Sequence, residues 1–160
     1  MNKNKKYRLM TQLGEWTCGV ACVASALGIS YRDALTRLEK YKGAKIGSRP
    51  HGLEPYPIIS VLRDAGLEVT EQSGYRRWPV GTIAFLSEER GKYKGGGHYL
   101  LKTPDAWMDP WFNFPDKPRR AAYRERLPHG TSLQVALVPC QGIESWFSSE
   151  PPLPNNSGFY

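Results

Sequence analysis

The sequence predicts an α+β protein, with helices in its first part and an antiparallel sheet after them. Its 160 residues are 40% hydrophobic and 23% charged, which suits one domain with its own core. Apolar residues recur at helical spacing between residues 18 and 65, and short apolar runs separated by turn residues follow from residue 67 onward. Helices followed by strands indicate an α+β order and not the alternation of a parallel sheet.

The first predicted helix runs from Cys18 to Gly28. Thr17 is suited to cap its start, glycine is suited to end it, and the small and apolar residues between them predict burial. A second helix is expected after Ser30, which is placed to cap it. Its apolar stripe reaches Tyr41.

A third helix is expected from Pro57 to Gly66, after a long surface connection over residues 42–56. The predicted strands cover residues 67–70, 82–86, 98–103, 107–109 and 133–138. Residues 1–148 are expected to form a single domain, and the Pro- and Asn-rich residues 149–160 a C-terminal tail.

The basic charge and the few cysteines restrict where this chain is expected to work. No apolar run approaches the ~18–20 residues of a membrane-spanning helix, and no apolar stretch follows the basic N-terminus, so we expect cytoplasmic synthesis without Sec export. Three cysteines do not make a disulfide framework. The net charge of +7 favours acidic surfaces, but the basic residues are scattered, so nucleic acid is not expected as the substrate. The densest basic group is predicted to be the solvated face of a short helix: Lys117, Arg119, Arg120, Arg124 and Arg126.

Cys18 is the candidate nucleophile. A cysteine at a helix start faces unpaired N–H groups and the positive end of the helix dipole, and both favour the reactive thiolate. A thiol nucleophile also needs a base, and His98 is the histidine that begins a predicted strand, whereas His51 and His129 lie among loop residues. Gln12, six residues before the cysteine, can donate its side-chain amide to an oxyanion beside the Cys18 N–H.

The predicted hairpin brings a carboxylate to His98. A two-residue turn at Thr103-Pro104 places Asp109 directly opposite His98, and a turn at Pro104-Asp105 places it diagonally, opposite Leu100. Both registers put the two side chains on one face of the sheet, where Asp109 can orient the imidazole. A three-residue loop would reverse this arrangement unless a bulge restored it. Asp105, at the turn, and Asn113, which needs another register, are the rival partners.

These residues resemble the papain-like cysteine peptidases, and most of all the bacteriocin-processing peptidases that cut leader peptides after a double glycine. The pattern Gln-x5-Cys-Gly-x-Ala-Cys/Ser of that group is matched by Gln12, Cys18, Gly19, Ala21 and Cys22, and the second half of the pattern by His98-Tyr-Leu-Leu and Asp109-Pro110. The resemblance implies a papain-like fold, with a helical half carrying the cysteine packed on an antiparallel sheet carrying the histidine and the aspartate. It assigns the nucleophile to Cys18, the general base and acid to His98, the orienting role to Asp109 and the oxyanion donor to Gln12.

The resemblance also implies a thiol protease that needs no cofactor or metal and cuts a protein or peptide with a Gly-Gly segment. Familiar members belong to ATP-driven exporters, but this chain lacks membrane segments and a phosphate-binding loop, so a free-standing enzyme or an isolated domain is expected. Stand-alone domains of this kind resemble antibacterial effector toxins, which a specialised secretion system delivers into the cytoplasm of a target cell and an immunity protein restrains. The alternatives are a glutamine deamidase or transglutaminase with the same triad, a leader-peptide-processing peptidase and an inactive peptide-binding module.

Three further residues are candidates for substrate binding. Trp107 and Trp111 flank Asp109, and one of them is expected to cover the His98–Asp109 pair, although both are equally suited to filling the core. Gly97 would let a substrate backbone approach His98, or would simply belong to a flexible loop. Cys22 is expected to be a core residue, and a zinc site using it lacks a fourth ligand.

Overall fold

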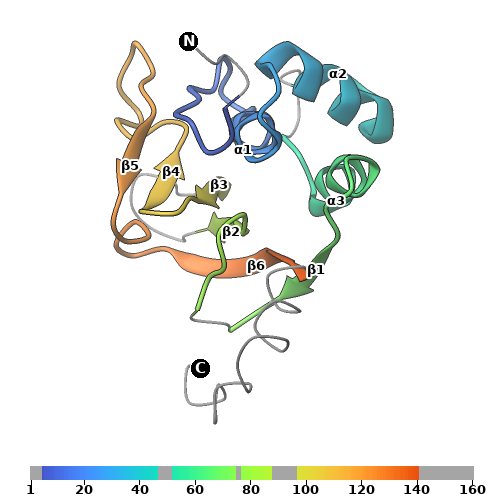
Figure 1. The fold of residues 1–160 in the computed structure, drawn as a ribbon. Coiled ribbons are helices and arrows are strands. Elements are labelled where there is room, and N and C mark those ends of the chain that lie inside the picture. The colour runs from blue at the N-terminus through green and yellow to red at the C-terminus, as the bar shows by residue number, and fades with distance from the viewer. Residues whose placement is uncertain (1–4, 47–51, 75–76, 88–96, 141–160) are drawn as a thin grey trace, which may run out of the picture.

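A computed structural model describes residues 5–46, 52–74, 77–87 and 97–140, and within them the chain forms three helices and six strands. The elements, in order, are α1 (Cys18–Leu27), α2 (Tyr31–Lys42), α3 (Pro55–Asp64), β1 (Val69–Gln72), β2 (Ile83–Ser87), β3 (Gly97–Lys102), β4 (Trp107–Asp109), β5 (Ala122–Arg124) and β6 (Ser132–Pro139). The strands form a single antiparallel sheet in the order β1-β6-β2-β3-β4-β5 (Figure 1). The predicted α+β class is confirmed, whereas the boundary at residue 148 and the tail lie outside the described residues.

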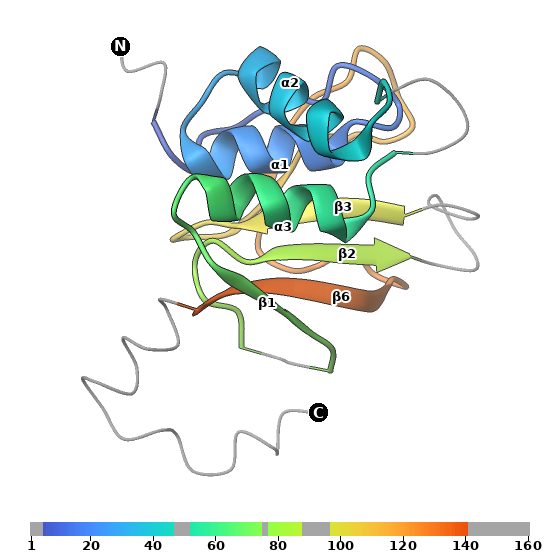
Figure 2. The same ribbon diagram turned by 90° about the vertical axis from the view of Figure 1, so that its right-hand side faces the viewer.

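The three helices lie together over one face of the sheet (Figure 2). The main core fills the space between the two layers, and α1 lies against β3 within it. A smaller apolar cluster packs on the other face of the sheet and contains Ala84, Leu86, Leu100 and Trp107. Since side chains alternate along a strand, the central strands β2, β3 and β4 contribute to both clusters.

Helix α1 is buried along nearly its whole length, because its small residues let it pack closely on both neighbouring helices and the sheet. It ends as predicted, at Gly28 in the left-handed conformation with φ of 69°. Thr17 occupies the N-cap position, as predicted, but its side chain makes no capping bond. The Thr17 hydroxyl makes two hydrogen bonds to the backbone of Gly14. It accepts from the Gly14 N–H at 2.9 Å and donates to the Gly14 carbonyl at 3.0 Å, so it is not available to the amides of the helix.

The boundaries of α2 and α3 differ little from prediction. The Ser30 hydroxyl accepts from the Asp33 N–H at 3.0 Å, which confirms the predicted cap of α2. Helix α3 begins at Pro55, two residues earlier than predicted, because proline is well suited to the first turn, where its missing N–H has no partner to lose.

The β3–β4 hairpin adopts the second of the two predicted registers. Leu101 pairs with Met108 and Lys102 with Trp107, so the turn is centred on Pro104-Asp105. The Thr103 N–H and hydroxyl both donate to the Ala106 carbonyl, at 2.8 and 2.6 Å, and these bonds fix the tight turn. When this pairing is continued along the two strands, Asp109 lies opposite Leu100 and on the same face as His98.

Strand β5 was not predicted. A short helix was expected for the basic group around it, but residues 122–124 pair with β4, Met108 lying opposite Tyr123. Alanine, arginine and glutamate favour helices locally, and pairing with a strand distant in the sequence overrides that preference. Of the basic group, only Arg124 lies in a strand, and the group is not one solvated face.

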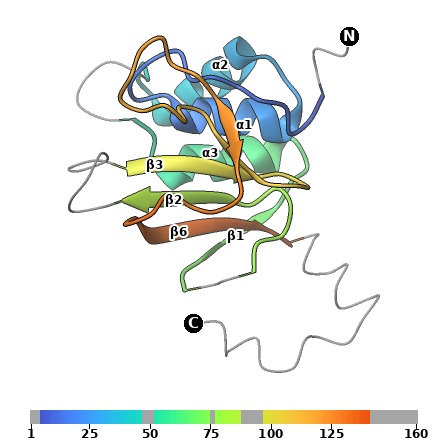
Figure 3. The ribbon, with the colours of Figure 1, turned by 90° about the vertical axis from the view of Figure 1, so that its left-hand side faces the viewer.

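The segment between β4 and β5 packs against the chain that leads into α1 (Figures 1 and 3). The Gln12 N–H donates to the Pro110 carbonyl at 3.2 Å, and the Ala121 N–H donates to the Thr11 hydroxyl at 3.1 Å. The Arg119 guanidinium donates to the Leu13 carbonyl at 3.3 Å. These contacts tie the segment that carries Gln12 to the one that follows Asp109.

Among the helices of the described residues, none has the length and apolar character needed to cross a membrane.

Candidate active site

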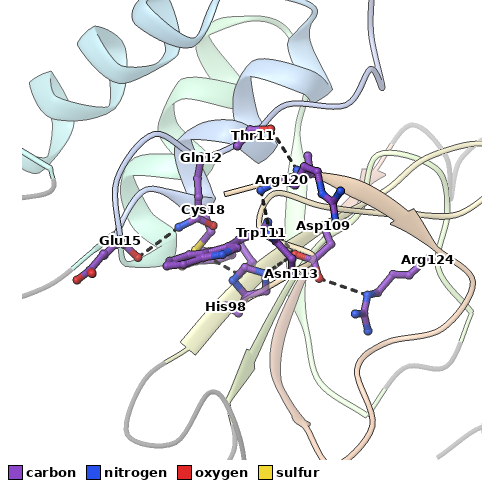
Figure 4. A network of polar contacts seen from close by, with 12 residues as sticks. Thr11, Gln12, Glu15, Cys18, His98, Asp109, Trp111, Asn113, Arg120 and Arg124 are labelled. Carbon is purple, nitrogen blue, oxygen red and sulfur yellow. Dashed lines mark hydrogen bonds and ion pairs between the residues drawn. The ribbon is translucent and has the colours of Figure 1, made fainter. Parts of the chain in front are cut away.

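Cys18 is the first residue of α1 and lies over the start of β3 (Figure 4). Its exposed fraction is 8%. The Tyr99 backbone N–H donates to the Cys18 sulfur at 3.5 Å, which holds the sulfur beside the strand that also carries His98. Because no side chain caps α1, its first amides remain directed at the space next to the sulfur.

His98 and Asp109 form a buried pair. The His98 Nε2 atom lies 2.6 Å from Asp109 Oδ1, and the two side chains are 5% and 0% exposed. The His98 ring also hydrogen-bonds the Cys18 side chain, and because the carboxylate occupies Nε2, we assign this bond to Nδ1. The imidazole therefore lies between the carboxylate and the thiol, in the order expected for a nucleophile, a base and an orienting acid.

The surroundings of His98 favour its charged form. Burial by itself lowers the pKa of the imidazole, but the hydrogen bonds to Asp109 and Cys18, with the negative charges of both groups, raise the pKa from 6.5 to about 9. An imidazolium next to a thiol favours transfer of the thiol proton, because the resulting thiolate gains an adjacent positive charge.

Asp109 is held as an anion by three neighbours. Burial raises the pKa of its carboxyl group, but His98, the Trp111 N–H and Arg124 together lower the pKa below its ordinary value. The Trp111 N–H donates to Oδ1 at 3.0 Å, and Arg124 Nε lies 3.3 Å from Oδ2. The sequence does not predict the role of Arg124, because only the unexpected strand β5 brings residue 124 to the carboxylate.

Gln12 lies in the same region as Cys18, and its side chain is 1% exposed (Figure 4). Its Nε2 group donates to the Gly14 carbonyl at 2.8 Å and, less closely, to the Glu15 carbonyl at 3.3 Å. Two carbonyl oxygens on one side fix the orientation of the amide, because reversing it would place oxygen against oxygen. Both Nε2 protons are therefore engaged by backbone carbonyls, and the buried Oε1 atom has no hydrogen-bond partner in the described structure.

The candidate substrate-binding residues lie in different surroundings. Trp107 is 3% exposed and belongs to the smaller apolar cluster, so it fills the core. Trp111 is equally buried, and its backbone rather than its ring bonds Asp109, while the ring packs on Phe114 and Arg119. A Cβ on Gly97 would lie 2.0 Å from the Phe85 ring, so packing requires glycine there, whatever the substrate.

The rival residues have other roles. Asp105 is exposed at the β3–β4 turn, and the Asn113 side chain bonds Pro118 and Arg120, at 3.0 and 2.9 Å. His129 is exposed, and His51 lies outside the described residues. Cys22 is fully buried, and burial raises the pKa of its thiol well above the ordinary value, so it remains a neutral core residue. Within the described part of the chain, no three His, Cys, Asp or Glu side chains are grouped so as to hold a metal ion.

Comparison with models of known protein families finds no match to this chain, and comparison with curated proteins finds none either. The chemistry that these residues can perform is therefore inferred from their own geometry. A thiol, an imidazole and a carboxylate in sequence, next to uncapped helix amides, can carry out acyl transfer through a covalent thioester.

Proposed function

We propose that this protein is a papain-like cysteine peptidase that uses Cys18 as nucleophile, His98 as general base and acid, and Asp109 as the orienting residue. The observation that carries the proposal is the buried chain of contacts from Asp109 through His98 to Cys18. A buried carboxylate and imidazole with mutually shifted pKa values are more typical of a functional site than of a core. The α+β arrangement, with the cysteine helix on an antiparallel sheet, is compatible with the papain-like fold.

The proposed reaction begins when His98 Nδ1 takes the Cys18 proton and the thiolate sulfur attacks the carbonyl carbon of the substrate. The oxyanion that forms accepts hydrogen bonds from the Cys18 N–H and from Gln12 Nε2. The C–N bond then breaks, and His98 gives its proton to the departing amine. Water activated by His98 next attacks the thioester and releases the acid and the free thiol. Asp109 keeps the imidazole in one tautomer and stabilises it when it is charged.

We further propose that cleavage follows a Gly-Gly segment of a target protein. The resemblance in sequence supports this specificity, and so does the low exposure of the reacting groups. Taken as whole residues, Cys18 and His98 are 8% and 4% exposed, and a backbone without side chains reaches such groups with the least displacement of their neighbours. The resemblance also supports a role as an antibacterial effector, with an immunity protein as the second partner.

The experiment that tests the activity compares wild-type protein and Cys18→Ala in a bacterial lysate. New protein N-termini are labelled chemically and identified by mass spectrometry. We expect new N-termini directly after Gly-Gly with the wild-type protein and none with Cys18→Ala. A target with either glycine replaced by alanine should resist cleavage.

Two other results would contradict the proposal. A gain of about one mass unit at glutamine, without new N-termini, would indicate a deamidase in place of a peptidase. Capture of a partner by wild-type protein and Cys18→Ala alike, with no chemical change in either case, would indicate a peptide-binding module.

A further inference from the structure

We propose that Arg124 is a positioning residue of this site, whose positive charge permits the thiolate–imidazolium pair to form beside a buried carboxylate. This inference rests on the proposed function and extends it to a residue outside the triad. Arg124 comes from β5, the strand that the sequence did not predict, and it reaches Asp109 from the side opposite His98 (Figure 4).

The net charge of the site shows why a further cation is needed. In the reactive state Cys18 and Asp109 are both negative and His98 is positive, which leaves one uncompensated negative charge in a buried region. Burying an unbalanced charge is costly, and the site would avoid the cost by keeping the thiol protonated. Arg124 brings the sum to zero.

The placement of Arg124 suits this role. Its side chain is 16% exposed, and its Nε atom lies 3.3 Å from Asp109 Oδ2. The guanidinium also rests on the Phe112 ring, with its carbon 4.8 Å from the ring centroid, which limits its movement. Neither Arg124 Nε nor Asp109 Oδ2 makes a hydrogen bond in the described structure, so the contact between them is electrostatic. A contact of this kind depends on charge more than on the shape of the guanidinium.

The remaining ionisable groups around the triad do not supply this charge. Cys22 from α1, Tyr31 from α2 and Tyr99 from β3 interact with Cys18, and burial raises the pKa of all three, so they are neutral near pH 7. The charge of Arg119 opposes the rise in the pKa of Tyr31, and its guanidinium packs on the Trp111 ring. In the part of the chain that the structure describes, Arg124 is the cation that forms an ion pair with Asp109 in addition to His98.

The test measures how fast iodoacetamide alkylates Cys18 as a function of pH, with the modified peptide identified by mass spectrometry. Because only the thiolate reacts, the acid limb of the profile reports the ionisation of Cys18. We expect Arg124→Gln to move this limb upward by about one pH unit, which slows alkylation about tenfold on the limb. Arg124→Lys keeps the charge and should restore the wild-type profile.

Arg126→Gln is the matched control, because it removes an equal charge from an exposed position two residues further on. Its profile should match the wild type. If Arg124→Gln does not fold, as judged by circular dichroism, Arg124→Met takes its place, since methionine keeps an apolar stem against Phe112. A profile that stays unchanged in the neutral variant would overturn the inference, and so would an equal shift in Arg124→Lys.

The alkylation experiment distinguishes a failure of the inference on Arg124 from a failure of the proposed function. If wild-type Cys18 reacts like an ordinary exposed thiol, with no reactive thiolate at neutral pH, the nucleophile assignment fails and the role of Arg124 fails with it. If wild-type Cys18 is reactive at neutral pH and the neutral Arg124 variant behaves in the same way, the inference on Arg124 alone is wrong.

Discussion

Asp109 Oδ1 lies 2.6 Å from His98 Nε2, and both side chains are shielded from solvent. The contact joins two strands of one hairpin, and its partners are separated by 11 positions in the sequence. A carboxylate and an imidazole this close share a charge-assisted hydrogen bond, which fixes the ring and sets its protonation.

Replacing Asp109 by asparagine should weaken both the reactivity and the stability of the protein. The imidazolium loses its anion, so we expect alkylation of Cys18 by iodoacetamide at pH 7 to slow by about tenfold or more. Arg124 is left without a counter-charge, which should lower the free energy of unfolding by about 3 kcal/mol in urea titrations. Asp105→Asn, at the exposed turn of the same hairpin, is the control and should change neither quantity. Equal behaviour of the two variants would refute the role of Asp109.

The stability of the protein should fall at alkaline pH because of His98. Its pKa is raised from 6.5 to about 9 in the folded protein, so its stabilising contribution is complete below pH 6.5 and is lost as the pH rises through about 9. The loss should be on the order of 3 kcal/mol, measured as the free energy of unfolding in urea across that range. His98→Gln cannot titrate there and should lack this slope. A wild-type stability that is flat from about pH 6 to pH 10 would contradict the assignment.

Gln12→Ala should slow cleavage of a substrate without changing the rate at which Cys18 is alkylated. If Nε2 donates to the oxyanion, cleavage of a Gly-Gly target should slow by about 10²–10³-fold. Alkylation by iodoacetamide forms no oxyanion, so its rate at Cys18 should stay at the wild-type level. A parallel fall of both rates would show that Gln12 acts by holding the local structure, through its bonds to Gly14 and Glu15.

Gly97→Ala should destabilise the protein through Phe85. The added methyl group would overlap the Phe85 ring, so we expect a loss of about 1–3 kcal/mol in the free energy of unfolding. Phe85→Leu in the same chain should recover part of that loss, and a double-mutant cycle in urea measures the coupling. Additive effects of the two substitutions would show that the ring does not restrict this position.

Production of the protein in bacterial cytoplasm should arrest growth if it is an antibacterial peptidase. Colony counts after induction should fall for the wild-type protein and remain high for Cys18→Ala. Cys140→Ala is the control, because this cysteine lies beyond the end of β6, away from the site, and should leave the toxicity intact. Equal toxicity of Cys18→Ala would exclude catalysis as the cause.

Local sequence patterns determined the helices and most of the sheet. Small apolar residues at helical spacing, a serine cap and a glycine end identified α1 and α2, because these signals act within a few residues of one another. The hairpin was predictable for the same reason. A two-residue turn allowed two registers, and both placed Asp109 on the face that carries His98, whereas a three-residue loop would have reversed it.

Only the tertiary structure decided the surroundings of the carboxylate. The basic group over residues 117–126 predicts a short helix, and residues 122–124 instead become strand β5 by pairing with β4. That pairing brings the charge of Arg124 to Asp109, and it forms over a distance in the sequence that no local pattern encodes. The hydrogen bond from Tyr99 to Cys18 depends in the same way on the packing of α1 across β3. The sequence by itself therefore determined which groups could react, and long-range packing decided which charges surround them.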